Sequence, residues 1–412
     1  MTSCLNQGDR DISSMDVNES SFDKIIIEAE DYNLSSNQFE KVEIDSTFRY
    51  VHPKSDGWIA FDINVLKSGI YGIKIHLSPV LKSLTTCWIE DYYDNKNDRT
   101  YNITGNFLIN DFSPNFKTVS KIGTPLKAGL HKMKFHFDKE IKVDWIEFTL
   151  LEEYQQSPVV MKQNIEGSEW KLVWSDEFDK NYIDSTKWTF DFGNWGWGNN
   201  EIQYYTKSQP DNARVTNGNL IIEARKDEIS NEWTSARLTT RDKVSFLYGK
   251  IECRVKVPTH KGNHSSVWTM GNAYVDEYSW PSCGEIDILE TVGYEIDDIT
   301  GNGLSHATAH GGGSYFKDGD KQNGLIEVAN MNNEFHIYAV EWLPDGIKEY
   351  VDNQLYATYN SNSTDLSWPY SNSQNIILNL AMGGSWGGSQ GIDEDISSQK
   401  MIIDYIRVYE LN

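Results

Sequence analysis

Basic side chains are scarce in this chain of 412 residues. Lysine and arginine total 37 against 61 aspartates and glutamates, which gives a formal net charge of −24. Nucleic-acid-binding proteins carry a basic face, so this balance argues against a nucleic-acid partner. The same charge repels polyanionic substrates such as sulfated polysaccharides, whereas neutral ligands and divalent cations fit it better. An acidic composition that serves solubility alone is an equally weighted alternative.

Cysteines are also few, and long apolar runs are missing. The spacing of Cys4, Cys87, Cys253 and Cys283 matches no zinc or Cys-x-x-Cys pattern. Cys253 and Cys283 stand in strand-like apolar runs, where buried free thiols are expected. No stretch is apolar enough to span a membrane, and none has the apolar core of a signal peptide.

The first residues give the one indication of location. Residues 1–4, "MTSC", resemble the end of a bacterial lipoprotein signal, with Cys4 as the lipidated residue, and a chance match is the alternative. Residues 1–21 are mostly polar and are expected to form a flexible tether. On this basis we expect an extracellular or cell-surface protein, and we expect it to be a monomer.

Short runs of strand type fill the rest of the chain, and long amphipathic helices are missing. Gly, Pro, Asn or Asp separate these runs, as in strands joined by turns. The expected strands are 58–65, 70–77, 132–137, 143–150, 219–224, 248–257, 335–342, 347–352, 374–382 and 402–410. Many short strands at even spacing predict an all-β fold of two β-sandwich domains. Residues 152–168 show no clear period and are expected to be a linker between domains at 22–151 and 169–412.

Aromatic residues are abundant, with 14 tryptophans in the chain. Most of them stand between Trp170 and Trp386, inside the second predicted domain. One interpretation is core packing in a sheet protein. The other is a cleft paved with flat rings, which suits the apolar faces of sugars.

The stretch "GEIDILE" (284–290) places three acids within six residues. Side chains alternate along a strand, so Glu285 and Asp287 share one face and Glu290 points to the other. A β-bulge would add one residue and return Glu290 to the face of the other two, and bulges are common beside active sites. An ordinary strand with exposed acids is the alternative that this stretch alone favours.

Three acids on one face would suit glycoside hydrolysis. One carboxylate attacks the anomeric carbon, and a second carboxyl keeps its proton to protonate the leaving oxygen. A third acid between them raises a neighbour's pKa and shares a proton with the nucleophile. Carboxyls about 5–5.5 Å apart predict retention of configuration.

The context of these acids resembles glycoside hydrolase family 16 in its laminarinase-like branch. The segment "SWPSCGEIDILETVG" (279–293) resembles the active-site strand of that branch, which has the extra residue between the last two acids. Further pieces match in order, namely "WGWGNNEIQYYT" (195–206), residues 235–258, "HATAHGG" (306–312), "LNLAMGGSWGG" (378–388) and "MIIDYIRVYE" (401–410). The resemblance implies a β-jelly-roll with a substrate cleft across its concave sheet, and retaining hydrolysis of β-1,3-glucan without a catalytic cofactor.

The resemblance also implies roles for individual residues. Glu285 matches the nucleophile, Glu290 the acid/base and Asp287 the acid that assists Glu285. The match places His310 near Glu290, where it could donate a hydrogen bond, and His306 is expected to be structural. Substrate contacts are implied for Trp280, Trp268, His310, Asn199, Arg237, Trp386 and Trp195.

Alternatives remain for several of these residues. Trp280 could be a core residue beside Pro281, and Arg237 could be a structural ion-pair partner. Asn200 could replace Asn199. The family commonly has W-P-A-x-W where this chain has His264 to Trp268, so His264 replaces the first tryptophan and one stacking position is lost.

Two structural calcium sites are implied by resemblance. In the catalytic domain the matching oxygens belong to Glu177, Gly218 and Asp404, with ordinary surface acids as the alternative. The N-terminal domain resembles carbohydrate-binding module family 6 through "IIIEAEDY" (25–32), residues 55–78 and "VDWIEF" (143–148). There the calcium ligands would be Glu28, Glu30 and Asp144. Lys142 and the segment 111–119 depart from that family's sugar-binding pattern, so this domain would bind through another face or act as a rigid spacer.

The expected function is therefore a retaining endo-β-1,3-glucanase whose partner is a β-glucan polysaccharide. A mixed-linkage β-1,3-1,4-glucanase, another β-glycan hydrolase of the family, or a transglycosylase are alternatives. A non-catalytic glucan receptor is a further alternative, but such a protein would be expected to lose the acids that this chain keeps.

Overall fold

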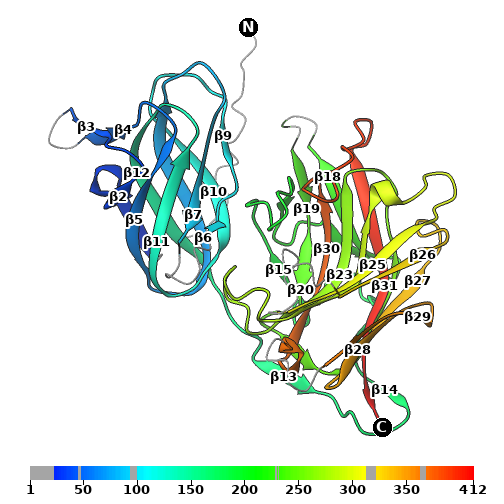
Figure 1. The fold of residues 1–412 in the computed structure, drawn as a ribbon. Coiled ribbons are helices and arrows are strands. Elements are labelled where there is room, and N and C mark those ends of the chain that lie inside the picture. The colour runs from blue at the N-terminus through cyan, green and yellow to red at the C-terminus, as the bar shows by residue number, and fades with distance from the viewer. Residues whose placement is uncertain are drawn as a thin grey trace. The chain divides into compact units, whose positions relative to one another are not determined.

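The computed structural model describes residues 23–44, 48–92, 100–227, 230, 232–311, 322–361 and 368–412. These residues form 31 strands and three short 3-10 helices, η3 (Ala29–Asp31), η4 (Gly293–Glu295) and η5 (Pro369–Ser371). The predicted all-β fold is thus confirmed, and in this part of the chain no helix could span a membrane. The chain divides into two compact units, each with its own core (Figure 1).

Unit 1 comprises Met1–Tyr154 together with Gly193–Gly198 and Val275–Glu277, and it holds two sheets of six strands. Sheet A runs β10 (Lys117–Leu126), β6 (Gly69–Pro79), β12 (Ile141–Glu153), β4 (Arg49–His52) and β3 (Glu40–Glu43), with β1 (Lys24–Glu28) on β12. Sheet B runs β2 (Leu34–Ser35), β5 (Gly57–Val65), β11 (Gly129–Phe137), β7 (Thr85–Asp91) and β8 (Tyr101–Asn102), with β9 (Phe107–Ile109) on β7. The core of this sandwich includes Ile75, Phe135 and Phe148.

Unit 2 covers Gln155–Phe192, Asn199–Tyr274 and Tyr278–Asn412, and it holds two larger sheets. Sheet C runs β13 (Val159–Lys162), β21 (Val244–Leu247), β30 (Gln374–Met382), β23 (Asn263–Gly271), β24 (Glu285–Val292), β25 (Gly303–His310) and β26 (Gln322–Val328), with β20 (Arg237–Thr239) joining β30 to β15 (Thr189–Asp191). Sheet D runs β16 (Tyr204–Tyr205), β19 (Trp233–Ser235), β18 (Asn219–Lys226), β31 (Ser398–Leu411), β22 (Gly249–Lys256), β27 (His336–Leu343), β28 (Gly346–Val351) and β29 (Gln354–Asn360), with β14 (Trp170–Asp176) on β31 and β17 (Ala213–Thr216) on β18.

Alternation of side chains builds the core between sheets C and D. Every second residue of β22 and of β25 is buried, as expected for strands with one face in a core. β30 is buried along its whole length because it lies in the middle of sheet C. We call the side of sheet C that turns away from this core its outer face.

One strand lies inside the segment predicted to be a linker. Val159–Lys162 forms β13, which pairs in parallel with β21 at the edge of sheet C. Three of its four residues are exposed, so the segment lacks the apolar alternation by which a strand is recognised. Gln163, directly after it, is buried and accepts a hydrogen bond from the Leu247 backbone at 3.2 Å.

The irregular ladder predicted near Ile288 and Leu289 is present in β24. Against β23, Leu289 pairs with Val267 and Asp287 with Trp268, so Ile288 is the extra residue. Against β25, the register shifts between Asp287 and Glu290. Ile288 and Leu289 both belong to the core, and Glu290 is thereby returned to the face of Glu285 and Asp287.

Candidate active site

The bulged strand β24 presents three acids on the outer face of sheet C. The side chains of Glu285 and Glu290 are 15% and 16% exposed, whereas that of Asp287 is 2% exposed. Ile286 between them points into the core. The local fold thus places one accessible carboxyl on each side of a buried one.

Glu285 is held by two side chains. The indole N–H of Trp280 donates a hydrogen bond to Glu285 Oε2 at 2.8 Å, and His310 Nε2 lies 3.7 Å from Oε1. Burial raises the pKa of Glu285 and the charge of Glu290 adds to this, while His310 and Trp280 act in the opposite direction. Trp280 also packs against the small cluster of Met270, Cys283 and Ile377, so its packing role and its polar contact coexist.

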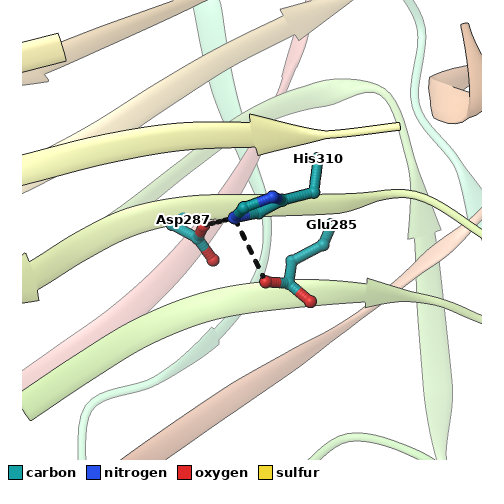
Figure 2. A group of neighbouring side chains, drawn as sticks. All are labelled: Glu285, Asp287 and His310. Carbon is teal, nitrogen blue, oxygen red and sulfur yellow. Dashed lines mark ion pairs between the residues drawn. The ribbon is translucent and has the colours of Figure 1, made fainter. Parts of the chain in front are cut away.

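Asp287 is the most strongly perturbed of the three acids. Burial, together with the charges of Glu290 and Glu285, raises its pKa well above the usual range. His310 Nε2 lies 3.3 Å from Asp287 Oδ2, and Figure 2 shows the imidazole between Asp287 and Glu285. Although burial acts to lower it, these contacts raise the pKa of His310 to about 9. Burial and like charges thus favour the protonated form of Asp287, and the surrounding carboxyls favour the imidazolium form of His310.

Glu290 has a different partner from the one predicted. Its Oε1 lies 3.0 Å from His264 Nε2, whereas His310 contacts Asp287 and Glu285. The ladder is the reason, because it pairs Glu290 with His306 and Glu285 with His310. The expectation that His310 donates to Glu290 is wrong. Against the raising effect of burial, the contact with His264 lowers the pKa of Glu290.

His264 is thus a site residue that its sequence position did not reveal. From the sequence, His264 indicates only the loss of a stacking tryptophan. A signal was present, since strand alternation places His264 on the same face as Ser266 and Trp268, and Ser266 pairs directly with Glu290. Recognising the contact required the register of β23 against the bulge.

Trp268 and Arg237 form a layered group beside the acids. The Arg237 guanidinium lies over the Trp268 ring, 4.7 Å from its centroid, and its Nε is 3.0 Å from Asp191 Oδ2. The Trp268 indole N–H donates to Asn379 Oδ1 at 2.7 Å. Arg237 is therefore an ion-pair partner, the alternative considered for it, and it covers one face of the Trp268 ring.

Trp386 lies next to two histidines of the site. Its ring centroid is 4.8 Å from that of His264 and 5.0 Å from that of His306. The His306 ring in turn contacts Glu295 at 2.6 Å, in keeping with the structural role expected for it. Trp386 is half-buried and so keeps some surface for a ligand.

The predicted loop residues 195 to 200 fall into two groups. Asn199 is exposed, and its carbonyl accepts a hydrogen bond from the Ser385 backbone at 2.6 Å, which connects this loop to the one that carries Trp386. Asn200 Nδ2 donates to Ser385 Oγ at 3.1 Å. Trp195 belongs to Gly193–Gly198 of unit 1, and its ring lies 3.5 Å from that of Trp197. A substrate contact by Trp195 stays a prediction.

The predicted calcium ligands of unit 2 are already paired with arginines. Glu177 accepts hydrogen bonds from Arg407 Nε at 3.0 Å and from Nη2 at 2.8 Å. Asp404 forms an ion pair with Arg254. Gly218 occupies the turn between β17 and β18 with φ of +75°. Because each carboxylate has a guanidinium partner, this set does not fit a calcium ion as arranged here.

The predicted calcium ligands of unit 1 crowd like charges together. Burial raises the pKa of Glu28, and the charges of Glu30 and Asp144 raise it further. Glu30 Oε2 is buried and has no hydrogen-bond partner among the residues that the structure describes. Asp144 Oδ2 lies 2.7 Å from His76 Nδ1. This donor set fits a cation better than that of unit 2 does.

One group of side chains has donor atoms at metal-ligand spacing in the described ranges. The donors of Glu285, Asp287 and His310 all lie within 4.8 Å of one another. Glu28, Glu30 and Asp144 do not form such a group in the described ranges. Cys87, Cys253 and Cys283 are buried and form no disulfide among the described residues, as expected for Cys253 and Cys283, and Cys4 lies outside the described residues.

Comparison with known proteins identifies a family that includes the strands of this site. A model of the glycosyl hydrolases family 16 matches residues 200–407. The chain is similar to a beta-glucanase of Rhodothermus marinus, 42% identical over 254 residues that cover 58% of this chain and 85% of that protein.

Solved structures agree with this match. The crystal structure of the laminarinase from Rhodothermus marinus is similar with a TM-score of 0.54 and 41% identity, over 59% of this chain and 98% of that one. The endo-beta-1,3-glucanase of Pyrococcus furiosus is similar with a TM-score of 0.53 and 34% identity, over 60% of this chain and 97% of that one.

Proposed function

The chain belongs to the glycosyl hydrolases of family 16, and on that premise we propose that it is a retaining endo-β-1,3-glucanase acting on laminarin-like glucan. The observation that carries the proposal is the bulge at Ile288, which presents Glu285, Asp287 and Glu290 on one face of sheet C. The similarity to the Rhodothermus and Pyrococcus enzymes supports the choice of substrate. The net charge of −24 suits a neutral polysaccharide better than a sulfated one.

The proposed mechanism is a double displacement. Glu285 attacks the anomeric carbon while Glu290 protonates the departing oxygen, and Glu290 then takes a proton from the water that releases the glycosyl enzyme. The Trp280 indole and the His310 imidazolium support the ionised form of Glu285, against the burial that opposes it. Asp287 keeps its proton beside Glu285 and so limits the repulsion among the three carboxyls.

The activity is tested by measuring reducing-sugar release from laminarin. Glu285→Gln and Glu290→Gln should each abolish it, because each removes one of the two required carboxyls. Thermal unfolding of both variants provides the control for folding. Laminarin turnover that survives either change in a folded variant contradicts the assignment.

Two further measurements separate the proposal from its alternatives. Side-by-side product profiles on laminarin, lichenan and agarose distinguish a β-1,3-glucanase from a mixed-linkage enzyme and from one acting on a galactose-based glycan. NMR of the first anomer released tests retention, since an inverting enzyme would release the α-anomer. Products longer than the substrate would reveal transglycosylation, and glucan binding without turnover would support a non-catalytic receptor.

We further propose that unit 1 is a glucan-binding module resembling carbohydrate-binding module family 6. Supporting it, the outer surface of sheet B carries Trp88 stacked on His136, with centroids 5.0 Å apart and planes at 2°, and Lys134 above the Trp58 ring at 4.6 Å. These rings are half-buried and stand on neighbouring strands. Trp88→Ala should weaken binding to insoluble β-1,3-glucan, measured by pull-down of a Glu285→Gln background, and unchanged binding would contradict this.

We also propose a structural calcium ion at Glu28, Glu30 and Asp144. A divalent cation would offset the like charges that raise the pKa of Glu28 and would give Glu30 Oε2 a partner. Adding calcium to chelator-treated protein should raise its melting temperature, and Glu30→Gln should remove that rise. A rise that persists in Glu30→Gln would place the ion elsewhere.

For localisation we propose attachment to the cell surface through Cys4. The support is the resemblance of residues 1–4 to the end of a lipoprotein signal. Metabolic labelling with palmitate of bacteria that express the full precursor should mark the protein, and Cys4→Ser should abolish the label. An unlabelled protein in the culture medium would favour secretion without an anchor.

A further inference from the structure

His264 lies buried on the outer face of sheet C, in direct contact with the acid/base candidate. It is 6% exposed, and its Nε2 is 3.0 Å from Glu290 Oε1 and 3.1 Å from Ser266 Oγ. Strand β23 supplies both His264 and Ser266, and β24 supplies Glu290. A contact between a buried imidazole and a mostly buried carboxyl is stronger than the same contact at the open surface.

The surroundings of His264 add a second acid. From the segment before β16, the half-buried Glu201 interacts electrostatically with His264, and its own carboxylate accepts a hydrogen bond from Gln203 at 2.7 Å. From the loop after β30, Trp386 covers the imidazole. From β25, His306 stands on the same Trp386 ring and is bound to Glu295. Two carboxyls therefore face His264.

We propose that His264 and Glu290 work as one acid/base unit in which a single proton is shared between imidazole and carboxyl. This inference rests on the proposed glucanase function and deepens it. His264 is a positioning residue here, since it acts through Glu290 and touches no reacting atom. It fixes the orientation of Glu290 through Oε1.

The proton count of the reaction is balanced with this unit. With one proton, the pair exists as imidazolium with carboxylate or as imidazole with carboxylic acid. The second form gives its proton to the leaving oxygen as the C1–O bond breaks and Glu285 bonds to C1. Water then attacks C1, the bond to Glu285 breaks, and the proton of that water returns to Glu290. No further reactant is required.

The electrostatics agree with a shared proton. Against the lowering effect of burial, Glu290 and Glu201 raise the pKa of His264, while His264 lowers that of Glu290. When two groups interact this closely, the loss of the proton is a property of the pair. The active, singly protonated pair therefore persists to a higher pH than a glutamic acid alone would allow.

The test is the pH dependence of kcat/KM on laminarin for the full chain and for His264→Gln. Glutamine keeps an N–H donor near Glu290 but cannot hold the mobile proton. We expect the alkaline limb to move to lower pH by about 1 unit or more, with the acid limb in place. The matched control is His336→Gln, because His336 also pairs with a carboxylate, Asp352 at 2.7 Å, on sheet D. That variant should leave the alkaline limb where it is.

A second measurement does not need turnover. In NMR titrations of ring-labelled histidines, the His264 resonance is identified by its loss in His264→Gln, and its pKa should fall in Glu290→Gln. An alkaline limb that stays within about 0.3 units, or a His264 pKa that Glu290→Gln leaves unchanged, overturns the shared proton. Absence of laminarin hydrolysis by the unaltered protein would instead overturn the proposed function, and the NMR result would still decide the pair.

Discussion

At the scale of single residues, the site works through the partners of its carboxyls. Trp280 shows this, since its ring packs on an apolar cluster while its indole N–H holds Glu285. From the sequence alone, these two roles are alternatives. One side chain fulfils both because the apolar body and the polar edge of tryptophan face different neighbours.

Trp280→Phe should impair the ionised form of Glu285. It keeps most of the ring but removes a hydrogen bond to a charged group, which contributes about 1.5–3 kcal/mol. We expect kcat/KM on laminarin to fall roughly 10–100-fold. Because this hydrogen bond lowers the pKa of Glu285, its loss should move the acid limb of the pH profile to higher pH. Trp386→Phe, which removes no bond to Glu285, should leave that limb in place, and an unmoved limb in Trp280→Phe would contradict the assignment.

Glu349 is a buried acid that the mechanism does not use. It is 0% exposed on β28, and neither carboxyl oxygen has a hydrogen-bond partner among the described residues. Burial, with the charge of Asp287, raises its pKa well above the usual range. The folded protein therefore holds a proton that the unfolded chain releases above about pH 4.3, so stability falls as pH rises.

Glu349→Gln should remove that pH dependence. We expect a melting temperature higher by roughly 2–4 °C at pH 8, and a smaller change at pH 5, because pH 5 lies close to the ordinary pKa of glutamate and folding then takes up a proton at little cost. Differential scanning calorimetry at the two pH values measures this. A variant that is no more stable than the parent at pH 8 would show that Glu349 is stabilised as a charged group.

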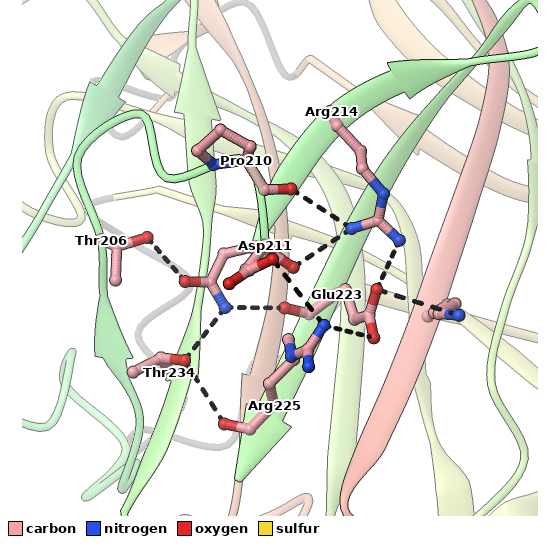
Figure 3. Close-up of polar contacts among 9 residues, drawn as sticks. Thr206, Pro210, Asp211, Arg214, Glu223, Arg225 and Thr234 are labelled. Atoms are coloured by element: carbon pink, nitrogen blue, oxygen red, sulfur yellow. Dashed lines mark hydrogen bonds and ion pairs between the residues drawn. The ribbon is translucent and has the colours of Figure 1, made fainter. Parts of the chain in front are cut away.

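At the scale of elements, buried polar contacts hold the short strands at one end of sheet D. Figure 3 shows Glu223 of β18 between Arg214 and Arg225. Asn212 donates to the Glu223 carbonyl at 3.0 Å and to Thr234 of β19 at 3.0 Å. The Glu223 side chain is 4% exposed, whereas that of Arg225 is 48% exposed. The exposed Arg225 side chain is therefore expected to contribute less to stability than the buried Glu223 carboxylate.

Arg214→Ala should destabilise the protein by about 3 kcal/mol, because it removes the hydrogen-bonded ion-pair partner of the buried Glu223 carboxylate. Arg225→Ala should cost less than about 1 kcal/mol, since its ion pair is open to solvent. Chemical denaturation of both variants gives the comparison. Equal losses in the two would mean that burial does not determine the strength of these pairs.

Alternating patterns made most strands predictable, and the exceptions have physical causes. The predicted runs 248–257 and 374–382 correspond to β22 and β30. β13 was missed because an edge strand with exposed residues has no apolar period. The parity of Glu290 raised the question of a bulge, and the flanking motifs that resemble the family favoured it. The His264 contact could not be predicted in this way, because it depends on register between strands. The pairing of Glu177 with Arg407 was likewise hidden, since the two are far apart in the sequence.

At the scale of the whole molecule, the two separate cores indicate two folding units. Strand β13 belongs to the second unit and therefore sets the N-terminal boundary of that unit. Residues 155–168 contribute β13, the buried Gln163 and Ser157, whose hydroxyl bonds Asn375. A chain that begins at residue 155 should hydrolyse laminarin and keep the stability of unit 2. One that begins at residue 169 should melt roughly 5 °C lower or more, because it loses these contacts. Equal melting temperatures would show that β13 adds nothing to unit 2.

The extra residue in β24 also affects how the spacing between the outer acids is compared from one sequence to another. Glu290 follows Glu285 by five positions along the chain, but the ladder advances by only four, because Ile288 and Leu289 share one. A regular strand with its outer acids four residues apart would present the same surface. Chains that differ by a one-residue gap at this point can therefore carry the same chemistry, and an alignment that penalises the gap would separate proteins that the strand makes equivalent.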